Sequence, residues 1–245
     1  MRRFEGELAI ESKGTANDLV TVADRESEAL IVARLRDAFP DDAILAEESG
    51  ASGGDGRRWI VDPLDGTTNF AHRFPHFSVS IALYEGAQAL LGVVYDPTRD
   101  ECFTAIACAG AWLDAPRRER RRLTMTTTAS VARGLFATGF PYDPVRAGHD
   151  NVAELGRVLA RSRGIRRPGS AALDHADAAA GRLDGYWEFA LQPWDCAAGV
   201  LMVREAAGAI ATVEGEAWSL ESRSIVVANP GLLPELLAIV RGESP

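Results

Sequence analysis

The residues whose chemistry is easiest to name are two aspartates at the end of an apolar run. Asp62 and Asp65 stand three positions apart around a proline, directly after Trp59-Ile60-Val61. Two carboxylates about 5 Å apart repel by roughly 3 kcal/mol at an effective dielectric near 20, so a cation is expected to hold them. Mg²⁺ takes oxygen ligands, and the turn could add the Leu64 carbonyl. The alternative is that both aspartates only shape the turn.

The residues around this pair suit a phosphate and further metal ligands. Gly66-Thr67-Thr68 offers backbone N–H groups where a turn or helix opens, and such groups commonly bind phosphate oxygens. Glu47 and Glu48 also follow a short apolar strand, and open α/β sheets bind ligands at strand ends. The spacing therefore predicts a site at one edge of a sheet.

Other polar residues have a simpler explanation beside the functional one. Asp195 follows Pro193-Trp194 and begins an apolar helical stretch, where an aspartate can serve as the N-cap. Thr21 and Asp24 stand at the head of the first expected helix, where capping is again the simpler role. Lys13 differs, because it is the single lysine among 26 basic residues. An ammonium and a guanidinium fill different geometries, so Lys13 is a candidate functional residue.

The elements that position these residues follow from the spacing of apolar side chains. Strands are expected at 43–46, 59–61, 77–83, 89–95, 102–107, 111–113, 123–128 and 225–228. Helices are expected at 19–39, 152–161, 171–182, 195–207 and 232–240, and residues 50–56 are expected to form a loop. The strand at 59–61 should stop at Asp62-Pro63, and Gly208 should close the third of the later helices. The interleaving predicts a layered α/β or α+β domain, 1–245, which could divide into packed halves at 1–145 and 146–245.

Composition excludes several classes of protein. The chain is 47% hydrophobic and 25% charged, an ordinary globular balance that excludes disorder. A net charge of −9 disfavours nucleic acid and anionic membranes as partners. No apolar run is long enough to span a membrane and no signal peptide is evident, so a cytoplasmic protein is expected. Cys102, Cys108 and Cys196 form no CxxC pair and are expected to be reduced.

Two patterns resemble a zinc site and a nucleic-acid-binding site, but each is better explained without such a function. His72 and His76 are four positions apart, yet Pro75 between them argues against a helical zinc pair. The run 117–122 holds five arginines and is the one stretch typical of nucleic-acid binding. No aromatic residues interleave it, so a solvated hairpin loop is expected.

Several separated motifs together resemble the inositol monophosphatase family. The segment 62–70, DPLDGTTNF, extended through 71–75, is similar to the first signature of that family, and 193–208, PWDCAAGVLMVREAAG, is similar to the second. The likeness continues through Lys13, 18–21 with Asp24, 46–49, 137–142, 169–172 and Glu188, so it covers nearly the whole chain in order. It implies the layered α-β-α-β-α sandwich of inositol monophosphatases and fructose-1,6-bisphosphatases.

The resemblance also implies a cofactor. Two or three Mg²⁺ ions would be bound by Glu47, Asp62, Asp65, Asp195 and the Leu64 carbonyl. One ion, held by Glu47, Asp62 and Leu64, would activate a water. Another, held by Asp62, Asp65 and Asp195, would stabilise the leaving oxygen.

Further residues gain roles by the same resemblance. Thr67, oriented by Asp24, would help to remove the proton of the water, and Lys13 would be a positive group near the metals. Glu188 would accept hydrogen bonds from substrate hydroxyls. The other residues expected at the substrate are Leu64, Asp65, Gly66, Thr67, Gly169, Ser170, Ala171 and Asp195.

The expected function is therefore that of a Mg²⁺-dependent phosphomonoesterase acting on a small polyol or sugar phosphate, with myo-inositol monophosphate first. The alternatives are fructose 1,6-bisphosphate, histidinol phosphate or 3′-phosphoadenosine 5′-phosphate as substrate, and a non-enzymatic interaction protein on the same fold. Thr68-Asn69-Phe70 favours the inositol-phosphate type, because adenosine-phosphate enzymes commonly have a lysine and a glutamate there. The resemblance further implies lithium inhibition and a homodimer.

The sequence departs from the family pattern in two places. Members usually carry a full helix ahead of the lysine motif, whereas twelve residues precede Lys13 here. Residues 174–177, Asp-His-Ala-Asp, lie in a helix that the family usually makes more apolar. Local packing or the wall of the substrate site is expected to differ there, while the metal ligands are unaffected.

Overall fold

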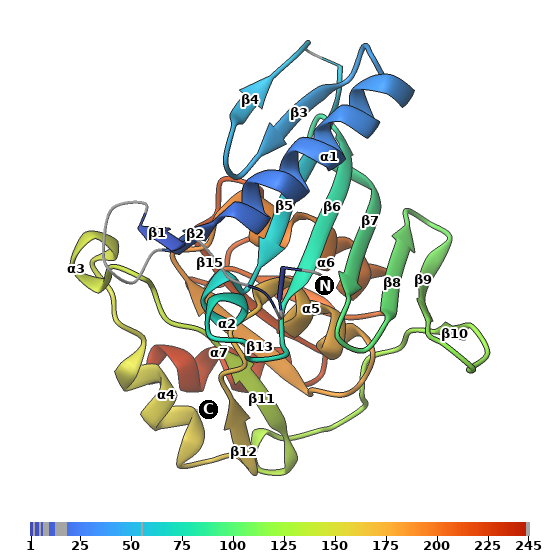
Figure 1. The fold of residues 1–245 in the computed structure, drawn as a ribbon. Coiled ribbons are helices and arrows are strands. Elements are labelled where there is room, and N and C mark those ends of the chain that lie inside the picture. Colours follow the sequence, from blue (N-terminus) through green and yellow to red (C-terminus); the bar gives the residue numbers. More distant parts are fainter. Residues whose placement is uncertain (2, 5, 7–9, 13–18, 55, 244–245) are drawn as a thin grey trace.

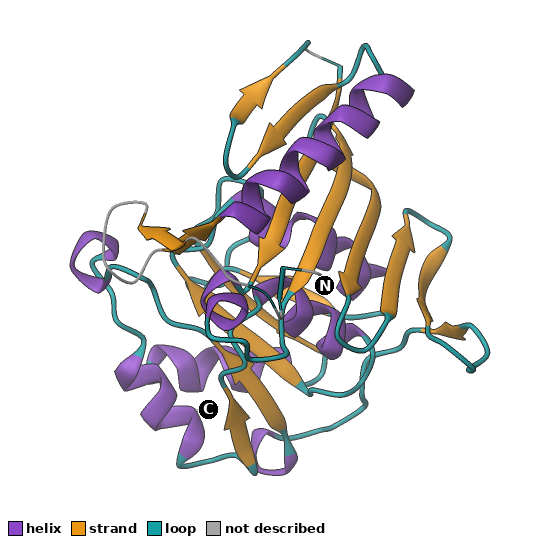
Figure 2. Ribbon diagram, viewed as in Figure 1, coloured by secondary structure: helices purple, strands orange, loops and turns teal. Residues whose placement is uncertain are grey.

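The computed structural model describes residues 1, 3–4, 6, 10–12, 19–54 and 56–243. Its two larger sheets and their helices form layers, and a third sheet of two short strands stands beside them (Figure 1, Figure 2). Lys13, the solitary lysine, lies outside the described residues, as does Asp18. No helix of the described ranges is both long and apolar enough to cross a membrane.

The first sheet carries the strand ends that the sequence singles out. Its strands, in spatial order, are β10 (Arg121–Arg122), β9 (Gly110–Asp114), β8 (Glu101–Ile106), β7 (Gln88–Asp96), β6 (Ser78–Glu85), β5 (Arg57–Asp65), β3 (Ala43–Ala46) and β4 (Gly50–Ser52). Only β3 and β5 pair in parallel in this sheet. Helix α1 (Val22–Ala38) covers one face, where Ile31, Val32 and Leu35 pack on buried side chains of β3 and β5.

The second sheet has its own outer helices. Its order is β12 (Gly164–Arg166), β11 (Leu135–Thr138), β13 (Gly185–Phe189), β15 (Ser224–Ala228) and β14 (Ala209–Ala211). The pairs β12–β11 and β11–β13 are parallel, and β15 is antiparallel to both of its neighbours. Helices α4 (Val152–Leu159) and α7 (Leu233–Arg241) cover the outer face, where Val158, Leu236 and Ile239 are buried with side chains of this sheet.

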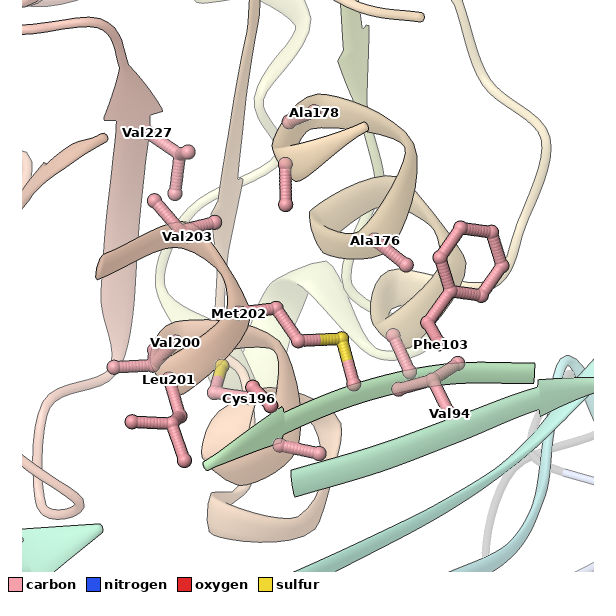
Figure 3. Packing of buried hydrophobic residues seen from close by; sticks show 14 of the residues in the cluster. Val94, Phe103, Ala176, Ala178, Cys196, Val200, Leu201, Met202, Val203 and Val227 are labelled. Carbon is pink, nitrogen blue, oxygen red and sulfur yellow. The ribbon is translucent and has the colours of Figure 1, made fainter. Parts of the chain in front are cut away.

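Two helices fill the space between the sheets. They are α5 (Ala171–Ala179) and α6 (Pro193–Glu205), whose apolar side chains pack with Phe103 of the first sheet and Val227 of the second (Figure 3). At Gly92 of β7 a Cβ would stand 2.8 Å from the carbonyl oxygen of Ala198, so the backbone of α6 rests directly on the sheet. The order helix, sheet, helices, sheet, helices confirms the layered α-β-α-β-α fold.

The remaining elements are short. They are β1 (Ile10–Ser12), β2 (Leu19–Thr21), α2 (Thr67–Ala71), the 3₁₀ turn η1 (Val131–Arg133) and α3 (Pro144–Ala147). The division into halves at 145 and 146 stays a prediction, although one apolar cluster takes side chains from both sheets.

Several expected strands differ from the observed ones. The strand expected at 123–128 is wrong. Leu123 and Met125 are buried at alternate positions, which imitates a strand, but the Met125 N–H donates to the Ala206 carbonyl beyond α6 and not to a strand. The loop expected at 50–56 begins with β4, paired to β3. Strands β11, β12, β13 and β14 were absent from the sequence prediction, because each is a run of three to five residues whose pairing is long-range.

Helix ends differ in ways that capping explains. Residues 19–21 form β2, and α1 starts only at Val22, because the Thr21 side chain accepts the Ala23 N–H and serves as the N-cap. The later helices end at Leu159, Ala179 and Glu205, two or three residues before the expected ends. In the arginine run, Arg121 and Arg122 pair with β9, and Arg120 lies over the Trp112 ring at 4.9 Å.

The structure also places the cysteines, His72 and His76, and the polar residues of α5. All three cysteines lie in the described ranges and are free. His76 is buried and His72 follows α2, so the two histidines share no helix. Asp174 and His175 are buried in α5, and a Cβ at Gly199 of α6 would overlap His175, so the helices touch at this point. Burial lowers the pKa of His175 to about 4, and its ring is neutral at pH 7.

Candidate active site

The first aspartate pair stands where β5 loses its regular pairing. The strand continues through Pro63 to Asp65, not ending at Asp62-Pro63 as expected, and its register with β6 shifts between Asp62 and Asp65. Pro63 has no N–H to donate, so it suits such an irregularity. Asp62 is 2% exposed, and its Oδ1 accepts the Leu64 N–H at 3.0 Å.

Asp65 reaches from the first sheet to the helix between the sheets. Its Oδ2 accepts hydrogen bonds from Ser170 Oγ at 2.5 Å and Ala172 N at 2.8 Å, and its Oδ1 accepts one from Ala171 N at 3.2 Å. These donors are the N-cap and first residues of α5, where backbone N–H groups favour an anion. The structure therefore brings the turn at 169–171 and Asp65 together, although Ser170 and Asp65 are 105 residues apart in sequence.

Thr67 is held by two acceptors. Its Oγ1 lies 2.9 Å from Asp24 Oδ1 and 3.0 Å from the Leu64 carbonyl oxygen. A hydroxyl has one proton, so it can donate fully to only one of them at a time. Asp24 is fully buried, and its Oδ2 also accepts the N–H and hydroxyl of Thr21. Asp24 thus both closes the capping box of α1 and orients Thr67, so its two expected roles coexist.

Glu47 directly follows β3 and lies in the wall of a cavity that it shares with Glu188 and Asp195. Its N–H donates to the Val61 carbonyl at 3.2 Å, which carries the parallel pairing of β3 and β5 one residue further. The turn behind it is fixed by Glu28 of α1, a residue that the sequence prediction missed. The Glu28 carboxylate accepts the N–H groups of Glu48 at 2.7 Å and Ser49 at 2.9 Å.

Asp195 enters the cavity from α6. The N-cap of this helix is Gln192, so the expectation of Asp195 as N-cap is wrong. Asp195 is the third helical residue, and its Oδ2 accepts the Gln192 N–H at 2.6 Å in a capping box. Helix α6 begins two residues earlier than expected because Pro193, which needs no hydrogen-bond acceptor, takes the first position.

The buried carboxylates act on one another electrostatically. Burial, followed by Glu47, Asp65 and Asp195, raises the pKa of Asp62 well above its usual range. Burial, with Asp65, Glu47 and Glu188, does the same to the pKa of Asp195. A divalent cation would restore the charged forms, so this donor set fits Mg²⁺. Among the described residues no three acidic, histidine or cysteine side chains already stand at ion-binding spacing, so the carboxylates would have to draw together around an ion.

Glu188 of β13 forms another wall of the site. Tyr186 donates a hydrogen bond of 2.5 Å to its Oε2, and a Cβ at Gly139 would overlap its carboxylate. Burial raises the pKa of Glu188 to about 7, and Asp65 adds to the shift. Gly139 belongs to the 137–142 motif, for which the sequence offered no role. The glycine leaves room for the Glu188 side chain.

The raised pKa of Glu188 predicts a pH dependence of stability. An acid that titrates near 7 when folded and near 4.5 when unfolded binds more protons in the folded state, so its contribution to the free energy of unfolding falls as the pH rises through that window. Glu188→Gln should gain about 3 kcal/mol in free energy of unfolding relative to the native chain between pH 4 and pH 8. Urea unfolding in metal-free buffer measures this difference. Parallel pH curves for the two chains would contradict it.

Part of this site lines one large cavity, of about 850 Å³. Glu47, Glu188 and Asp195 are in its wall, with Tyr142, His149, Phe189 and Trp194 among the aromatic and imidazole side chains. Partial burial, followed by the charges of Asp65, Asp195 and Glu188, raises the pKa of Tyr142, so its hydroxyl stays protonated at pH 7.

The sequence analysis predicted no role for Asn69 or Asn151, which the structure shows to be hydrogen-bonded across elements. The Asn69 Nδ2 donates to the carbonyls of His76 and Pro168, each at 2.7 Å, and so ties α2 to the turn that leads into α5. Asn151 is fully buried and bonds both β11 and β13. Asn69 lies within the first signature, but its partner Pro168 is 99 residues away in sequence, which no local pattern shows.

Similarity to known proteins agrees with this arrangement. The sequence profile of the inositol monophosphatase family matches residues 1–244. The chain belongs to the inositol monophosphatase family. It is 45% identical over 229 residues to an inositol-1-monophosphatase of Synechocystis, covering 93% of this chain and 78% of that protein.

Other relatives of this inositol monophosphatase family member carry a different name. The chain is 40% identical over 245 residues to Nus factor SuhB of Escherichia coli K12, covering 99% of this chain and 90% of that protein. The crystal structure of extragenic suppressor protein suhB from Bartonella henselae matches it with a TM-score of 0.88 at 41% identity, over 96% of this chain and 89% of that one. The fold and the family thus agree with the expected class.

Proposed function

We propose that the protein is a Mg²⁺-dependent phosphomonoesterase that hydrolyses a small polyol or sugar phosphate, with myo-inositol monophosphate as the first candidate. The observation that carries the proposal is a cluster of carboxylates beside one cavity, in which Asp195 of the cavity wall raises the pKa of the buried Asp62. Buried acids of this kind cost stability unless a ligand uses them. Membership of the family supports the same activity.

The proposed division of labour follows the contacts. One Mg²⁺ would be held by Glu47, Asp62 and the Leu64 carbonyl. Another would be held by Asp62, Asp65 and Asp195, and the full number of ions would be two or three. Bound Mg²⁺ supplies charge that lowers the pKa of water and stabilises a leaving oxygen. If the Leu64 carbonyl binds a cation, the Thr67 hydroxyl would donate its hydrogen bond to Asp24 instead. The Thr67 oxygen could then accept a hydrogen bond from the attacking water.

The substrate would lie between two sets of groups. Gly66, Thr67 and the turn Gly169-Ser170-Ala171 would contact the phosphate end, whereas Glu188 would accept hydrogen bonds from polyol hydroxyls. Gly66 has φ of 96° and a Cβ there would stand 3.0 Å from the Gly169 carbonyl, so the two turns approach closely. Lys13 as a positive group near the metals, inhibition by lithium and a homodimer stay predictions from the family resemblance.

Metal removal and a substrate panel test the proposal. Phosphate release from myo-inositol 1-phosphate should fall below about 1% after chelation and return with added Mg²⁺, because without the cations the carboxylates would repel the phosphate and no charge would lower the pKa of the attacking water. Fructose 1,6-bisphosphate, histidinol phosphate and 3′-phosphoadenosine 5′-phosphate are assayed beside it at equal concentration. Activity that persists without divalent cations would refute the metal requirement, and a strong preference for the nucleotide would refute the choice of inositol.

A second candidate function is a non-enzymatic interaction protein on the same fold. It is favoured by the relatives named Nus factor SuhB, which match nearly the whole chain. This alternative predicts that Mg²⁺ raises the melting temperature while no phosphate ester of the panel is hydrolysed. The Thr67–Asp24 pair, which a binding protein would not need, favours the enzyme.

A further inference from the structure

His149 lines the cavity, and neither the sequence analysis nor the proposed chemistry gives it a role. At about 850 Å³ the cavity is near the upper end of the range for ligand pockets, roughly 300–1,000 Å³, so it extends beyond the metal-binding carboxylates. His149, in the segment between α3 and α4, lies in its wall together with Glu188 and Phe189. The side chain of His149 is 34% exposed, so part of the ring is open to the cavity.

Two contacts fix the imidazole in place. Its ring centroid lies 3.9 Å from that of Phe189, with 38° between the planes. On another side, Nε2 lies 3.3 Å from Oε2 of Glu154, whose Oε1 accepts a hydrogen bond of 2.6 Å from Arg157. The Arg157 guanidinium in turn donates to two carbonyls near the end of α7. A ring held on both sides loses little conformational freedom when it binds a ligand.

The segment that carries His149 is tied to the strands of the site. The Asn151 amide donates to Thr138 Oγ1 at 2.7 Å and to the Gly139 carbonyl at 2.6 Å, and its oxygen accepts the Trp187 indole N–H at 2.8 Å. Thr138 ends β11, and Trp187 precedes Glu188 in β13. His149 and Glu188 are therefore positioned by one network.

We propose that His149 is a specificity-determining residue that hydrogen-bonds the hydroxyls of the leaving group, on the side away from the phosphate. The inference rests on the proposed function and deepens it. Glu188 and Phe189 are the last two residues of β13 and both line the cavity, so the ring that lies against Phe189 borders the same cavity as the Glu188 carboxylate. A carboxylate can only accept hydrogen bonds, whereas an imidazole N–H can donate one, and because Nε2 of His149 is buried beside Glu154, Nδ1 is the nitrogen left for a ligand. The pair suits a leaving group with several hydroxyls.

Paired substrates separate this role from a structural one. His149→Ala should raise the KM for myo-inositol 1-phosphate about tenfold, the effect of one lost hydrogen bond, with kcat changed less than about twofold. The KM for phenyl phosphate, whose leaving group has no further hydroxyl, should not change. His149→Gln, which keeps a donor and an acceptor, should restore most of the affinity. His72→Ala, an exposed histidine outside the cavity wall, is the matched control.

A binding measurement keeps the test independent of turnover. Calorimetric titration of myo-inositol in the presence of Mg²⁺ and phosphate should show weaker binding to His149→Ala than to the native chain. Weaker binding without any turnover would refute the proposed hydrolase and leave the role of His149 supported. Hydrolysis with equal KM values in the native and His149→Ala proteins would overturn the inference alone. An equal loss on both substrates would also overturn it, because it would indicate a structural role.

Discussion

Replacing Asp195 by asparagine is expected to reduce Mg²⁺-dependent phosphate release by about a thousandfold or more, a loss at the upper end for one preorganised group. Asp195 supplies a negative charge that burial and three other carboxylates make costly, which is the arrangement expected of a metal ligand. The amide keeps an oxygen that can accept the Gln192 N–H, so the capping box of α6 survives. The fold should persist, and in metal-free buffer the variant should melt no lower than the native chain.

Two measurements check this expectation. Phosphate release at saturating substrate gives the loss of activity, and the Mg²⁺-induced rise in melting temperature, which reports binding to the folded state, should shrink. Glu221→Gln makes the same chemical change at an exposed carboxyl outside the cavity wall and should alter neither. If Asp195→Asn retained native activity, Asp195 would not be a metal ligand.

Gly139→Ala is expected to lower kcat/KM by about a hundredfold without unfolding the protein. The added Cβ would occupy the space of the Glu188 carboxylate, and that carboxylate is the movable end of a side chain, so it is displaced while the backbone stays. A shift of about 1 Å in a substrate-positioning group can cost a hundredfold in rate. The Tyr186 hydrogen bond to Glu188 should be lost with it.

A double-mutant cycle shows whether Gly139 acts through Glu188. If it does, adding Gly139→Ala to Glu188→Ala should cost almost nothing further, because the methyl group then meets an empty space. Independent, additive losses in kcat/KM would show that Gly139 matters for another reason. Circular dichroism and urea midpoints of each variant confirm that the comparison is made between folded proteins.

Two of the metal-ligand candidates could be predicted because each follows an apolar run. Asp62 follows Trp59-Ile60-Val61 within β5, and Glu47 follows β3, so their positions are local properties of the sequence. The Thr21 cap and the opening of α2 after Gly66 are local in the same sense. The roles of these residues, in contrast, came from the family resemblance.

The other side of the site could not be predicted in this way. Glu188 depends on Gly139 for space, and the two residues meet only because β11 and β13 pair in parallel. Parallel pairing places no turn signal between its strands, so neither short strand was expected. His149 and Asn151 acquire their partners from the same tertiary contacts.

The bond between Asp65 and the start of α5 affects the order in which the molecule can be completed. Asp65 emerges early during synthesis, while its partners Ser170 and Ala172 and the neighbouring Asp195 are made only in the last third of the chain. Until then the carboxylates of the nascent chain remain hydrated and separate, since no second layer covers them. Most of the polypeptide must therefore have left the ribosome before the chain can bind a cation tightly.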